Sequence, residues 1–480
     1  MIEKPDKKKS VAPAMAGERR ELFERLVDRH HMLEVFQRTL PRLSTAPVRV
    51  TSCRLKQRRR RVALREERLE LVYRVGVELP DGSERVYVLL GTAPEPAEFA
   101  DAARARVLSD HPELAPFESA AAYVPELELA LRFFPLDPAL PALAELTGAR
   151  GAALVAPHLA ECRAGAALLG IECELRQYKP FKRAVLRVVA RLADGRSRAL
   201  YVKMFADQRG ADTYRELRPL YVATQQLAPR AARGLCLPEP LGYDGELGML
   251  FLAEAAGQRD LTEWLKCLGK GQPLPGGVDL ARLEQCVTVA AQAAADLRHS
   301  GIRPRRKRTF EDELARLHRD LATLGAKVPA EALVGARKLV AGLERLAPTD
   351  TGLVPVHGCF RHKQMVGDEH GLSVIDWDGL CLGQPGLDAA TFVCRLERSL
   401  DGPAGSAREF ARLADAFRRE FLARCGDVSA RELALCEALV RTQDLLRAFR
   451  RPLDESTRQV QTLARAAAES LAQAAESGGC

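Results

Sequence analysis

The chain has 480 residues, 47% of them hydrophobic, which is enough apolar material to bury one large core or several smaller ones. It contains no apolar run of the roughly eighteen residues that a membrane span needs. Its polar N-terminal tail, residues 1–16, lacks the apolar segment of a secretory signal. We therefore expect a globular, cytoplasmic protein that does not enter a membrane.

Charge and cysteine content narrow the class further. The net charge is +8, from 72 basic and 64 acidic residues, and the basic residues gather in short runs at 58–61 and 303–308. Such runs could bind nucleic acid. However, they lack interleaved aromatic residues and lie where turns are expected, which favours solvated loops. The twelve cysteines form no Cys-x-x-Cys pair, which argues against a zinc knuckle or a disulfide framework.

The first predicted elements are a helix and a sheet. Apolar residues recur at helical spacing between Glu18 and Thr39, so residues 17–45 should hold an N-terminal helix. From residue 46, alternating apolar residues and the Asp81-Gly82 turn predict an antiparallel meander, with a helix following at 96–108. We take residues 46–150 as one domain.

This meander has a counterpart later in the chain. Residues 53–65, CRLKQRRRRVALR, resemble residues 173–187, CELRQYKPFKRAVLR, and the Asp-Gly turn recurs at Asp194-Gly195. The domain at 46–150 is therefore predicted to be a degenerate duplicate of a sheet lobe at 170–255. The alternative is two unrelated meanders of similar composition.

The duplicates differ at one informative position. When the strands after the two turns are matched by their apolar residues, Lys203 lies where the first copy has Leu89. A lysine among apolar neighbours needs a partner if it is buried. This comparison indicates that only the second copy keeps a role for a charge.

The remainder, residues 256–476, reads mostly as amphipathic helices. The predicted helices cover 278–300, 309–325, 330–346, 386–399, 405–425, 429–449 and 454–475. One non-helical segment, 351–385, interrupts them and should form short strands near Met365 and at 372–375 joined by a turn. Chemistry is expected in this interruption.

Several residues could serve phosphoryl transfer, which needs a cation on the phosphates, oxygen ligands for magnesium and an acceptor for the hydroxyl proton. Lys203 could contact nucleotide phosphates, and Glu216, on the following helix, could hold it by an ion pair. A surface lysine and a surface glutamate are the plainer alternative. The strand and connector at 248–261 could present backbone groups of Ala253 and Ala255 to an adenine, although an ordinary strand-to-helix connection looks the same.

Two stretches resemble a known family. VHGCFRHKQMV, at 356–366, and SVIDWDGLCLGQPGLDAATF, at 373–392, are similar to the HGDxHxxN and IDWD signatures of the aminoglycoside phosphotransferase and choline kinase-like family. The steps of five residues from Cys359 to Gln364 and of twelve from Gln364 to Asp376 fit that pattern, and Asp388 follows the Gly-x-Pro turn as in the family. The resemblance spans about 170–450.

The resemblance implies an α+β, protein-kinase-like two-lobed fold, with an antiparallel sheet lobe, a helical lobe and the extra N-terminal domain in front. It implies ATP, or another nucleoside triphosphate, and Mg²⁺ as cofactors, and a small-molecule substrate. It also implies roles for individual residues: His357 props the catalytic loop, Gln364 and Asp376 bind magnesium, Asp378 is a further ligand or a brace, Lys203 steadies the phosphates, and Glu216 orients Lys203.

The departures from the family matter equally. Cys359 stands at the position of the catalytic aspartate, and a thiol with a pKa of about 8.5 is mostly protonated at neutral pH. Losing a general base removes on the order of 10²–10⁴ in rate. Gln364 replaces an asparagine but keeps its amide oxygen. The phosphate-covering loop, residues 178–183, has no glycine, so the charges of Lys179, Lys182 and Arg183 would have to substitute for backbone amides.

Three functions stay open at this point. The first is a weak ATP-dependent small-molecule kinase, and the second is a pseudokinase-like module that binds nucleotide or ligand and acts by association, with the N-terminal domain as a surface for a protein partner. The third is a nucleic-acid-binding protein. A thiol nucleophile at Cys359, with His357 or His362 as its base, is disfavoured because only sequence proximity supports it.

Overall fold

The computed structural model describes residues 21–63, 66–94, 111, 114–227, 235–255, 259–326, 328–348, 352–368, 371–398, 404–450 and 453–476. The chain divides into two compact units. The sheet unit comprises Met1–Gln208 and Tyr243–Phe251, and the helical unit comprises Arg209–Gly242 and Leu252–Cys480. This division confirms the α+β class. It assigns the helix after Lys203 to the helical unit, which differs from the boundary at residue 255 expected from the sequence.

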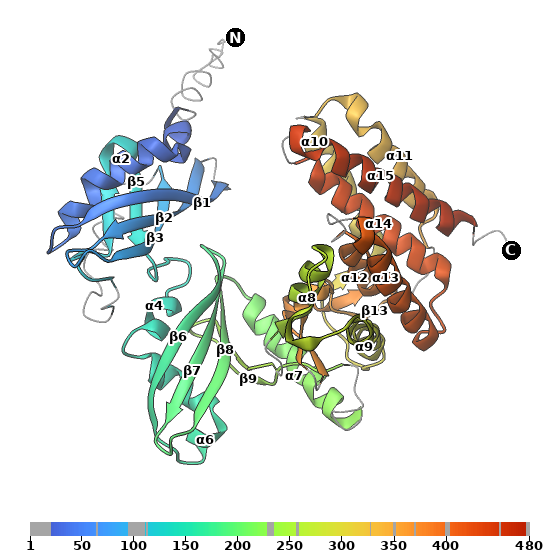
Figure 1. The fold of residues 1–480 in the computed structure, drawn as a ribbon, viewed down its shortest axis with the longest axis horizontal. Coiled ribbons are helices and arrows are strands. Elements are labelled where there is room, and N and C mark those ends of the chain that lie inside the picture. Colours follow the sequence, from blue (N-terminus) through green and yellow to red (C-terminus); the bar gives the residue numbers. More distant parts are fainter. Residues whose placement is uncertain are drawn as a thin grey trace, which may run out of the picture. The chain divides into compact units, whose positions relative to one another are not determined.

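The first sheet has five strands in the order β1-β2-β3-β5-β4, and its pairs are antiparallel. The strands are β1 (Arg49–Ala63), β2 (Glu66–Glu78), β3 (Glu84–Ala93), β4 (Ala121–Val124) and β5 (Leu129–Phe133). Helix α2 (Arg29–Thr39) covers one face of this sheet (Figure 1). Phe36 of the helix meets Tyr73 of β2 edge to face, with ring centroids 5.1 Å apart, inside the buried core.

The N-terminal helix is interrupted, which the sequence did not predict. Residues 21–27 are helical, but Asp28 leaves the helical conformation and accepts the amide of His31 at 2.7 Å, so it caps a new helix, α2. The start of the expected helix before residue 21 and the expected helix at 96–108 lie outside the described residues.

The second sheet repeats the strand order of the first, as β6-β7-β8-β10-β9. Its strands are β6 (Leu168–Lys179), β7 (Arg183–Leu192), β8 (Ser197–Phe205), β9 (Pro240–Asp244) and β10 (Met249–Ala253). The first strand of each sheet has a bulge at the same point of the sequence repeat, between Leu55 and Gln57 and between Leu175 and Gln177. Strand order and bulge together support the duplicated sheet.

The hairpin registers correct one detail of the repeat. Glu78 pairs with Glu84 across the first Asp-Gly turn, and Arg191 pairs with Ser197 across the second, so the two turns have equal length. Counting from these pairs, the counterpart of Lys203 is Leu90 and not Leu89. The sequence match was one residue out because it aligned the two tyrosines of these strands, which inserts a residue that the turn does not contain.

Short helices connect the two sheets. After β5 come α4 (Ala142–Thr147), α5 (Gly151–Val155) and α6 (Ala160–Arg163). Gly151 lies so close to the carbonyl of Leu146 that no side chain fits there, and α5 packs on β6. His158 stacks on Phe251 of β10 at 3.7 Å between ring centroids. These helices therefore serve as the packing partners of the second sheet.

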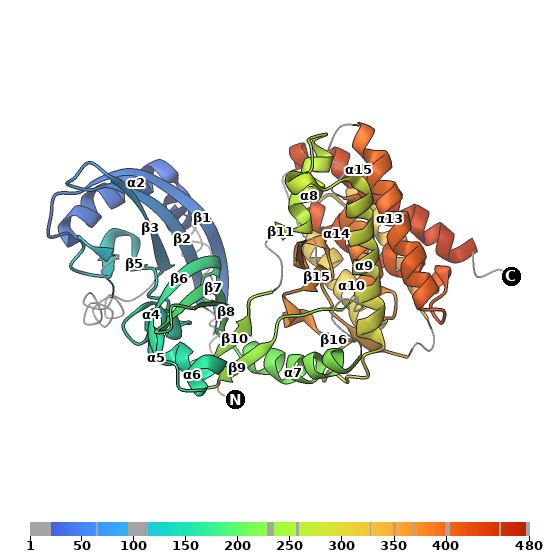
Figure 2. The ribbon, with the colours of Figure 1, turned by 60° about the horizontal axis from the view of Figure 1, so that its bottom comes forward.

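The helical unit contains helices and two small sheets, visible in Figure 2. Its helices are α7 (Arg209–Leu227), α8 (Leu261–Gly269), α9 (Leu280–Arg298), α10 (Phe310–Gly325), α11 (Val334–Arg345), α12 (Leu387–Glu397), α13 (Ala404–Arg424), α14 (Ala430–Ala448) and α15 (Leu453–Glu476). From α9 onward the ends differ from the predicted ones by no more than four residues, so these predictions are confirmed.

The small sheets carry the loops of interest. One sheet pairs β11 (Arg259–Asp260), β14 (Met365–Asp368) and β15 (Gly371–Val374), and the other pairs β12 (Lys307–Arg308), β16 (Cys381–Gly383) and β13 (Val354–Val356). The predicted interruption of the helices is thereby confirmed.

None of the described helices combines the length and the apolar character required to cross a bilayer.

Candidate functional site

The two loops that resemble the family signatures lie together at one end of the β14–β15 hairpin. Met365 pairs with Val374, so the residues just outside this pair, Gln364 and Ile375, are neighbours. The amide of Ile375 donates to the carbonyl of Gln364 at 2.9 Å. Asp376 follows directly. The hairpin thus brings the expected catalytic-like loop and the expected metal-like loop side by side within the helical unit.

His357 joins the two loops. Its side chain is fully buried, and its Nε2 lies 3.0 Å from the carbonyl oxygen of Ile375, which requires a proton on Nε2. The ring packs against Trp377, with centroids 4.7 Å apart, and the indole N–H of Trp377 donates to the carbonyl of Val374. A histidine in this position fixes the distance between the loops by a hydrogen bond and an aromatic contact.

Asp388 holds the loop from the other side. It lies at the start of α12 and is 3% exposed, and its two carboxylate oxygens accept the amides of His357 (2.5 Å) and Gly358 (3.0 Å). Burial raises the pKa of Asp388, while the charge of His357 and the two amide donors oppose that rise. The carboxylate therefore sets the backbone direction just before Cys359.

Gly358 is required by this geometry. Its φ is +74°, and a Cβ atom there would lie 2.5 Å from the carbonyl oxygen of Gly379 in the neighbouring loop. Any side chain at this position would push the two loops apart.

A buried basic residue, which the sequence did not single out, also holds the loop. Arg308 had been assigned to a solvated run, yet it is half-buried and donates to the carbonyl of Gly358 at 2.7 Å and to Glu313 at 2.6 Å. Gln443 of α14 donates to the other oxygen of Glu313 at 2.6 Å. The solvated-loop prediction is thus wrong for Arg308. A possible sequence signal was Glu313, an acid on the apolar face of the helix that follows.

Cys359 and Gln364 face each other. The thiol is half-buried, and the amide nitrogen of Gln364 points at its sulfur at 3.7 Å. The amide oxygen of Gln364 accepts from the Arg361 guanidinium at 3.2 Å. Gln364 is itself 2% exposed. The structure therefore places the expected catalytic position and one expected metal ligand in contact.

The carboxylates of the metal-like loop are half-buried. Asp376 has a φ of +68°, an uncommon conformation for a residue with a side chain, and it begins the short 3₁₀ turn Trp377–Gly379 that carries Asp378. Hard oxygen donors of this kind suit Mg²⁺, which usually takes one or two carboxylates and completes its shell with water and phosphate oxygens. Asp376 and Asp378 fit such a site. Gln364 would fit only after its oxygen leaves Arg361.

Among the described residues, no three His, Cys, Asp or Glu side chains lie together as a metal site of their own. A magnesium ion would therefore depend on oxygens that a nucleotide brings.

The remaining expected residues belong partly to the other unit. Lys203 lies in the middle of β8 in the sheet unit, opposite Val185, and is 7% exposed. Glu216 lies on α7 in the helical unit, where its carboxylate accepts the amide of Arg305 at 3.1 Å. The ion pair between Lys203 and Glu216 would span the two units and stays a prediction.

The other expected nucleotide contacts also stay predictions. Lys179 is exposed at the end of β6. The amide of Ala253 donates to the carbonyl of Glu239 at 2.8 Å, so this N–H is used within the protein. Ala255 lies in the connector before α8 and is half-buried.

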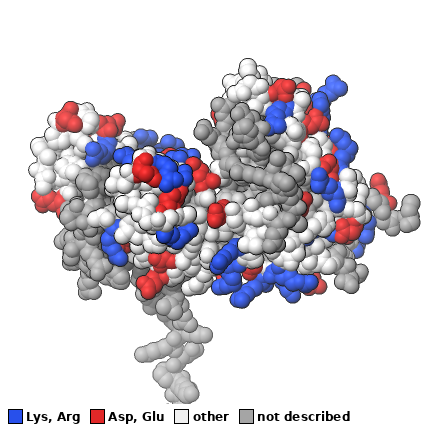
Figure 3. Space-filling view, turned by 90° about the horizontal axis from the view of Figure 1, so that it is seen from below, with Lys and Arg blue, Asp and Glu red and all other residues white. Residues whose placement is uncertain are grey.

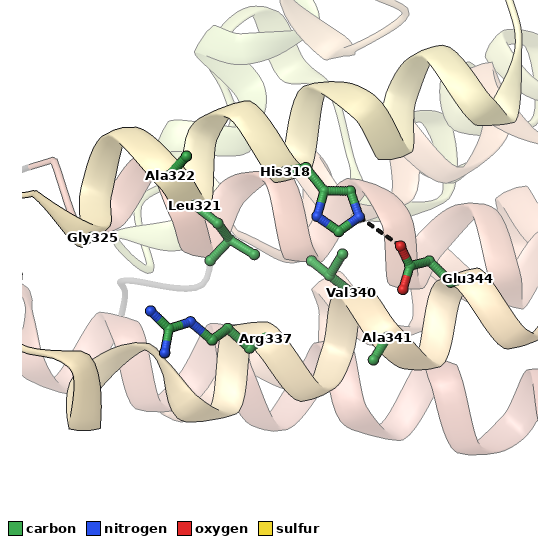
Figure 4. Close-up of a pocket in the computed structure, with 8 residues that line it drawn as sticks. All are labelled: His318, Leu321, Ala322, Gly325, Arg337, Val340, Ala341 and Glu344. Carbon is green, nitrogen blue, oxygen red and sulfur yellow. Dashed lines mark hydrogen bonds and ion pairs between the residues drawn. The ribbon is translucent and has the colours of Figure 1, made fainter.

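A separate hollow lies between α10 and α11, with a volume of about 490 Å³ (Figure 4). His318 and Glu344 meet across it at 2.6 Å, and Leu321, Val340 and Arg337 line the rest. Its lining includes none of the residues expected from the sequence. On the molecular face in Figure 3, acidic and basic side chains are mixed, apart from one basic group.

Comparison with protein-family models found no match, and comparison with curated proteins found none either. Among solved structures, the chain is similar to a macrolide 2'-phosphotransferase from Brachybacterium faecium, with 16% identity over 67% of this chain and 97% of that one and a TM-score of 0.39. It is similar to a thermostable mutant of an aminoglycoside phosphotransferase, with 14% identity, 67% and 98% coverage and a TM-score of 0.42. For a choline kinase from Cryptosporidium parvum the values are 10%, 68%, 96% and 0.45.

Proposed function

We propose that this protein is an aminoglycoside phosphotransferase-like protein that binds ATP or another nucleoside triphosphate with Mg²⁺ and has an impaired ability to phosphorylate a small-molecule hydroxyl. The observation that carries the proposal is the pairing of the two signature-like loops. Gln364 and Asp376 are neighbours on one hairpin end, and His357 and Asp388 hold the loop that carries Cys359.

The residues divide into three tasks in this proposal. Lys203, oriented by Glu216, and Lys179 contact the phosphates, and the connector at Ala253 and Ala255 receives the base. Asp376 and Asp378 would hold the magnesium ion, with Gln364 as a further ligand once its side chain turns. When bound, magnesium neutralises charge on the phosphate oxygens.

The impairment follows from Cys359. In phosphoryl transfer by this type of site, a carboxylate accepts the proton of the attacking hydroxyl and orients it. A thiol is mostly protonated at neutral pH, and here its sulfur is the target of the Gln364 amide at 3.7 Å. We expect a loss of about 10²–10⁴ in rate from this exchange alone. Binding without turnover would then be the main activity.

The test begins with nucleotide binding. ATP is titrated into the protein with and without Mg²⁺ by calorimetry, and ATP consumption is then measured with amino-alcohols, amino sugars and sugars. We expect magnesium-dependent binding with little or no turnover. Measurable turnover of one acceptor would instead identify a weak kinase. An absence of binding, together with salt-dependent binding to DNA or RNA, would favour the nucleic-acid alternative.

The second step restores the missing carboxylate. Cys359→Asp should raise any phosphoryl transfer by about 10²–10⁴, whereas Cys359→Asn, which has nearly the same shape but no charge, should not. An equal rate in both variants would mean that Cys359 does not occupy the proton-accepting position. Lys203→Ala should weaken ATP binding in the same assay, and unchanged binding would remove that lysine from the site.

A further inference from the structure

The tip of the β6–β7 hairpin, residues 178–183, is held by the segment that follows the first sheet. Asp137, in the connection after β5, accepts the hydroxyl of Tyr178 at 2.9 Å and the amide of Phe181 at 2.8 Å with one carboxylate oxygen. Its other oxygen accepts the amide of Ala139 at 2.9 Å. The side chain is 3% exposed. A buried carboxylate thus ties a strand tip to a segment more than forty residues earlier in the chain.

Apolar contacts hold the same tip. Phe181 is 8% exposed and packs with Val72 and Leu90 of the first sheet, in a cluster separate from the core under α2. The ring of Tyr178 meets that of Phe134 edge to face, with centroids 5.1 Å apart. All of these residues belong to the sheet unit.

The tip has a backbone shape that needs such support. Phe181 has a φ of +58°, a left-handed conformation that is costly for a residue with a Cβ atom. The amide of Lys182 donates to the carbonyl of Lys179 at 3.0 Å, and the amide of Phe181 donates to Asp137. These two amides are therefore engaged inside the protein, and phosphate contacts from the tip would come from side chains.

The carboxylate is itself costly to bury. Burial raises the pKa of Asp137, and the donors from Phe181, Ala139 and Tyr178 oppose that rise. A buried group that accepts three hydrogen bonds is stabilised only while all three donors stay in place, so it favours a single arrangement of the tip.

We propose that Asp137 is a positioning residue for nucleotide binding: the first sheet and the connection after it act as a brace that fixes the glycine-free tip, so that Lys179 and Lys182 present their charges to the phosphates. This inference rests on the proposed function, since the tip covers phosphates only if a nucleotide binds. Fixing a binding element in advance raises affinity because less freedom is lost on binding.

Two measurements on the full chain test the brace. The affinity for ATP with Mg²⁺ is measured by calorimetry, and hydrogen exchange is followed for the amides of residues 178–183 and, as an internal reference, 184–205. Asp137→Asn should weaken ATP binding by about tenfold and speed exchange at the tip while leaving the reference strands unchanged. Tyr178→Phe, which removes one of the three donors, should have a smaller effect of the same sign.

Asp81→Asn is the matched control, because Asp81 is an exposed turn carboxylate of the first sheet that accepts the amide of Ser83. It should change neither measurement. Equal or tighter ATP binding in Asp137→Asn and in Tyr178→Phe would overturn the brace, and tighter binding would show that Asp137 competes with the nucleotide for the tip. If Asp137→Asn fails to fold, Tyr178→Phe decides the question. An unaltered protein that does not bind ATP would overturn the proposed function itself.

Discussion

The two sheets of the sheet unit share an architecture and differ at one chemically important position. Both have five strands in the same order, and in both the second hairpin turns at an Asp-Gly pair. At the position where the second sheet has Lys203, 7% exposed, the first has Leu90, which is fully buried. The comparison teaches that the strand framework does not depend on the lysine.

The two residues also have different neighbours. Leu90 packs with Val72 and with Phe181 from the tip of the second sheet. The surface that the first sheet presents here is therefore apolar and contacts protein. A buried lysine costs stability unless it is paired, so its presence in the second sheet alone favours a ligand or partner there. The four predictions that follow test this division of roles.

The largest effect is expected when the lysine is placed in the wrong sheet. Leu90→Lys should destabilise the protein by on the order of 4 kcal/mol, because it removes a buried apolar side chain and places an ammonium group against Val72 and Phe181. Urea unfolding measures this loss. Leu90→Met, which keeps volume and character, should cost less than about 1.5 kcal/mol. Equal stability of the two variants would mean that the first sheet can accept the charge.

The reverse exchange should affect binding more than stability. Lys203→Leu should leave the free energy of unfolding unchanged or raise it, since a buried amine is replaced by an apolar chain, but it should weaken ATP binding by roughly a hundredfold. Lys203→Arg keeps the charge with a different shape and should fall between the two. A variant that binds ATP as tightly as the unaltered protein would show that the sheets do not differ in function at this position.

Much of this comparison could be predicted from the sequence. The repeat of Cys-x-Leu-x-Gln near residues 53 and 173 gave both sheets, because alternating apolar residues and Asp-Gly turns have a direct geometric meaning. The helices after residue 277 were found for the same reason. The neighbouring positions of Gln364 and Asp376 were expected only through the family resemblance, since hairpin register cannot be read from spacing alone.

Other features had no periodic signal. The break at Asp28 depends on a single capping hydrogen bond, and the match of Lys203 with Leu89 failed because side-chain likeness outweighed turn length. The links from Arg308 to Glu313 and from Asp137 to Phe181 join residues by specific hydrogen bonds. Such contacts depend on the folded chain, and polar residues at these positions read as surface residues in the sequence.

The helical unit sharpens the comparison, because the signature-like loops belong to the part of the chain that follows the second sheet. Asp388→Asn should destabilise the protein by about 2 kcal/mol, since one of its carboxylate oxygens becomes an amide group that faces the N–H of His357 or Gly358. Thermal unfolding with a denaturant series measures the change. Asp378→Asn, at a half-buried turn position, serves as the control and should cost clearly less. Equal costs would mean that Asp388 does not hold the loop.

The smallest effect tests whether the two hairpins are equivalent where no function is expected. Gly82 and Gly195 occupy the same turn position with φ of +79° and +82°, and an added Cβ would meet nothing within 4 Å at either site. Gly82→Ala and Gly195→Ala should therefore each cost about 1 kcal/mol from the left-handed backbone alone, and the double variant should cost the sum. Urea unfolding of the three variants checks this. Because both turns are open, a clear inequality could not come from packing at the turn, and it would show that the two hairpins contribute unequally to the unfolding of the sheet unit.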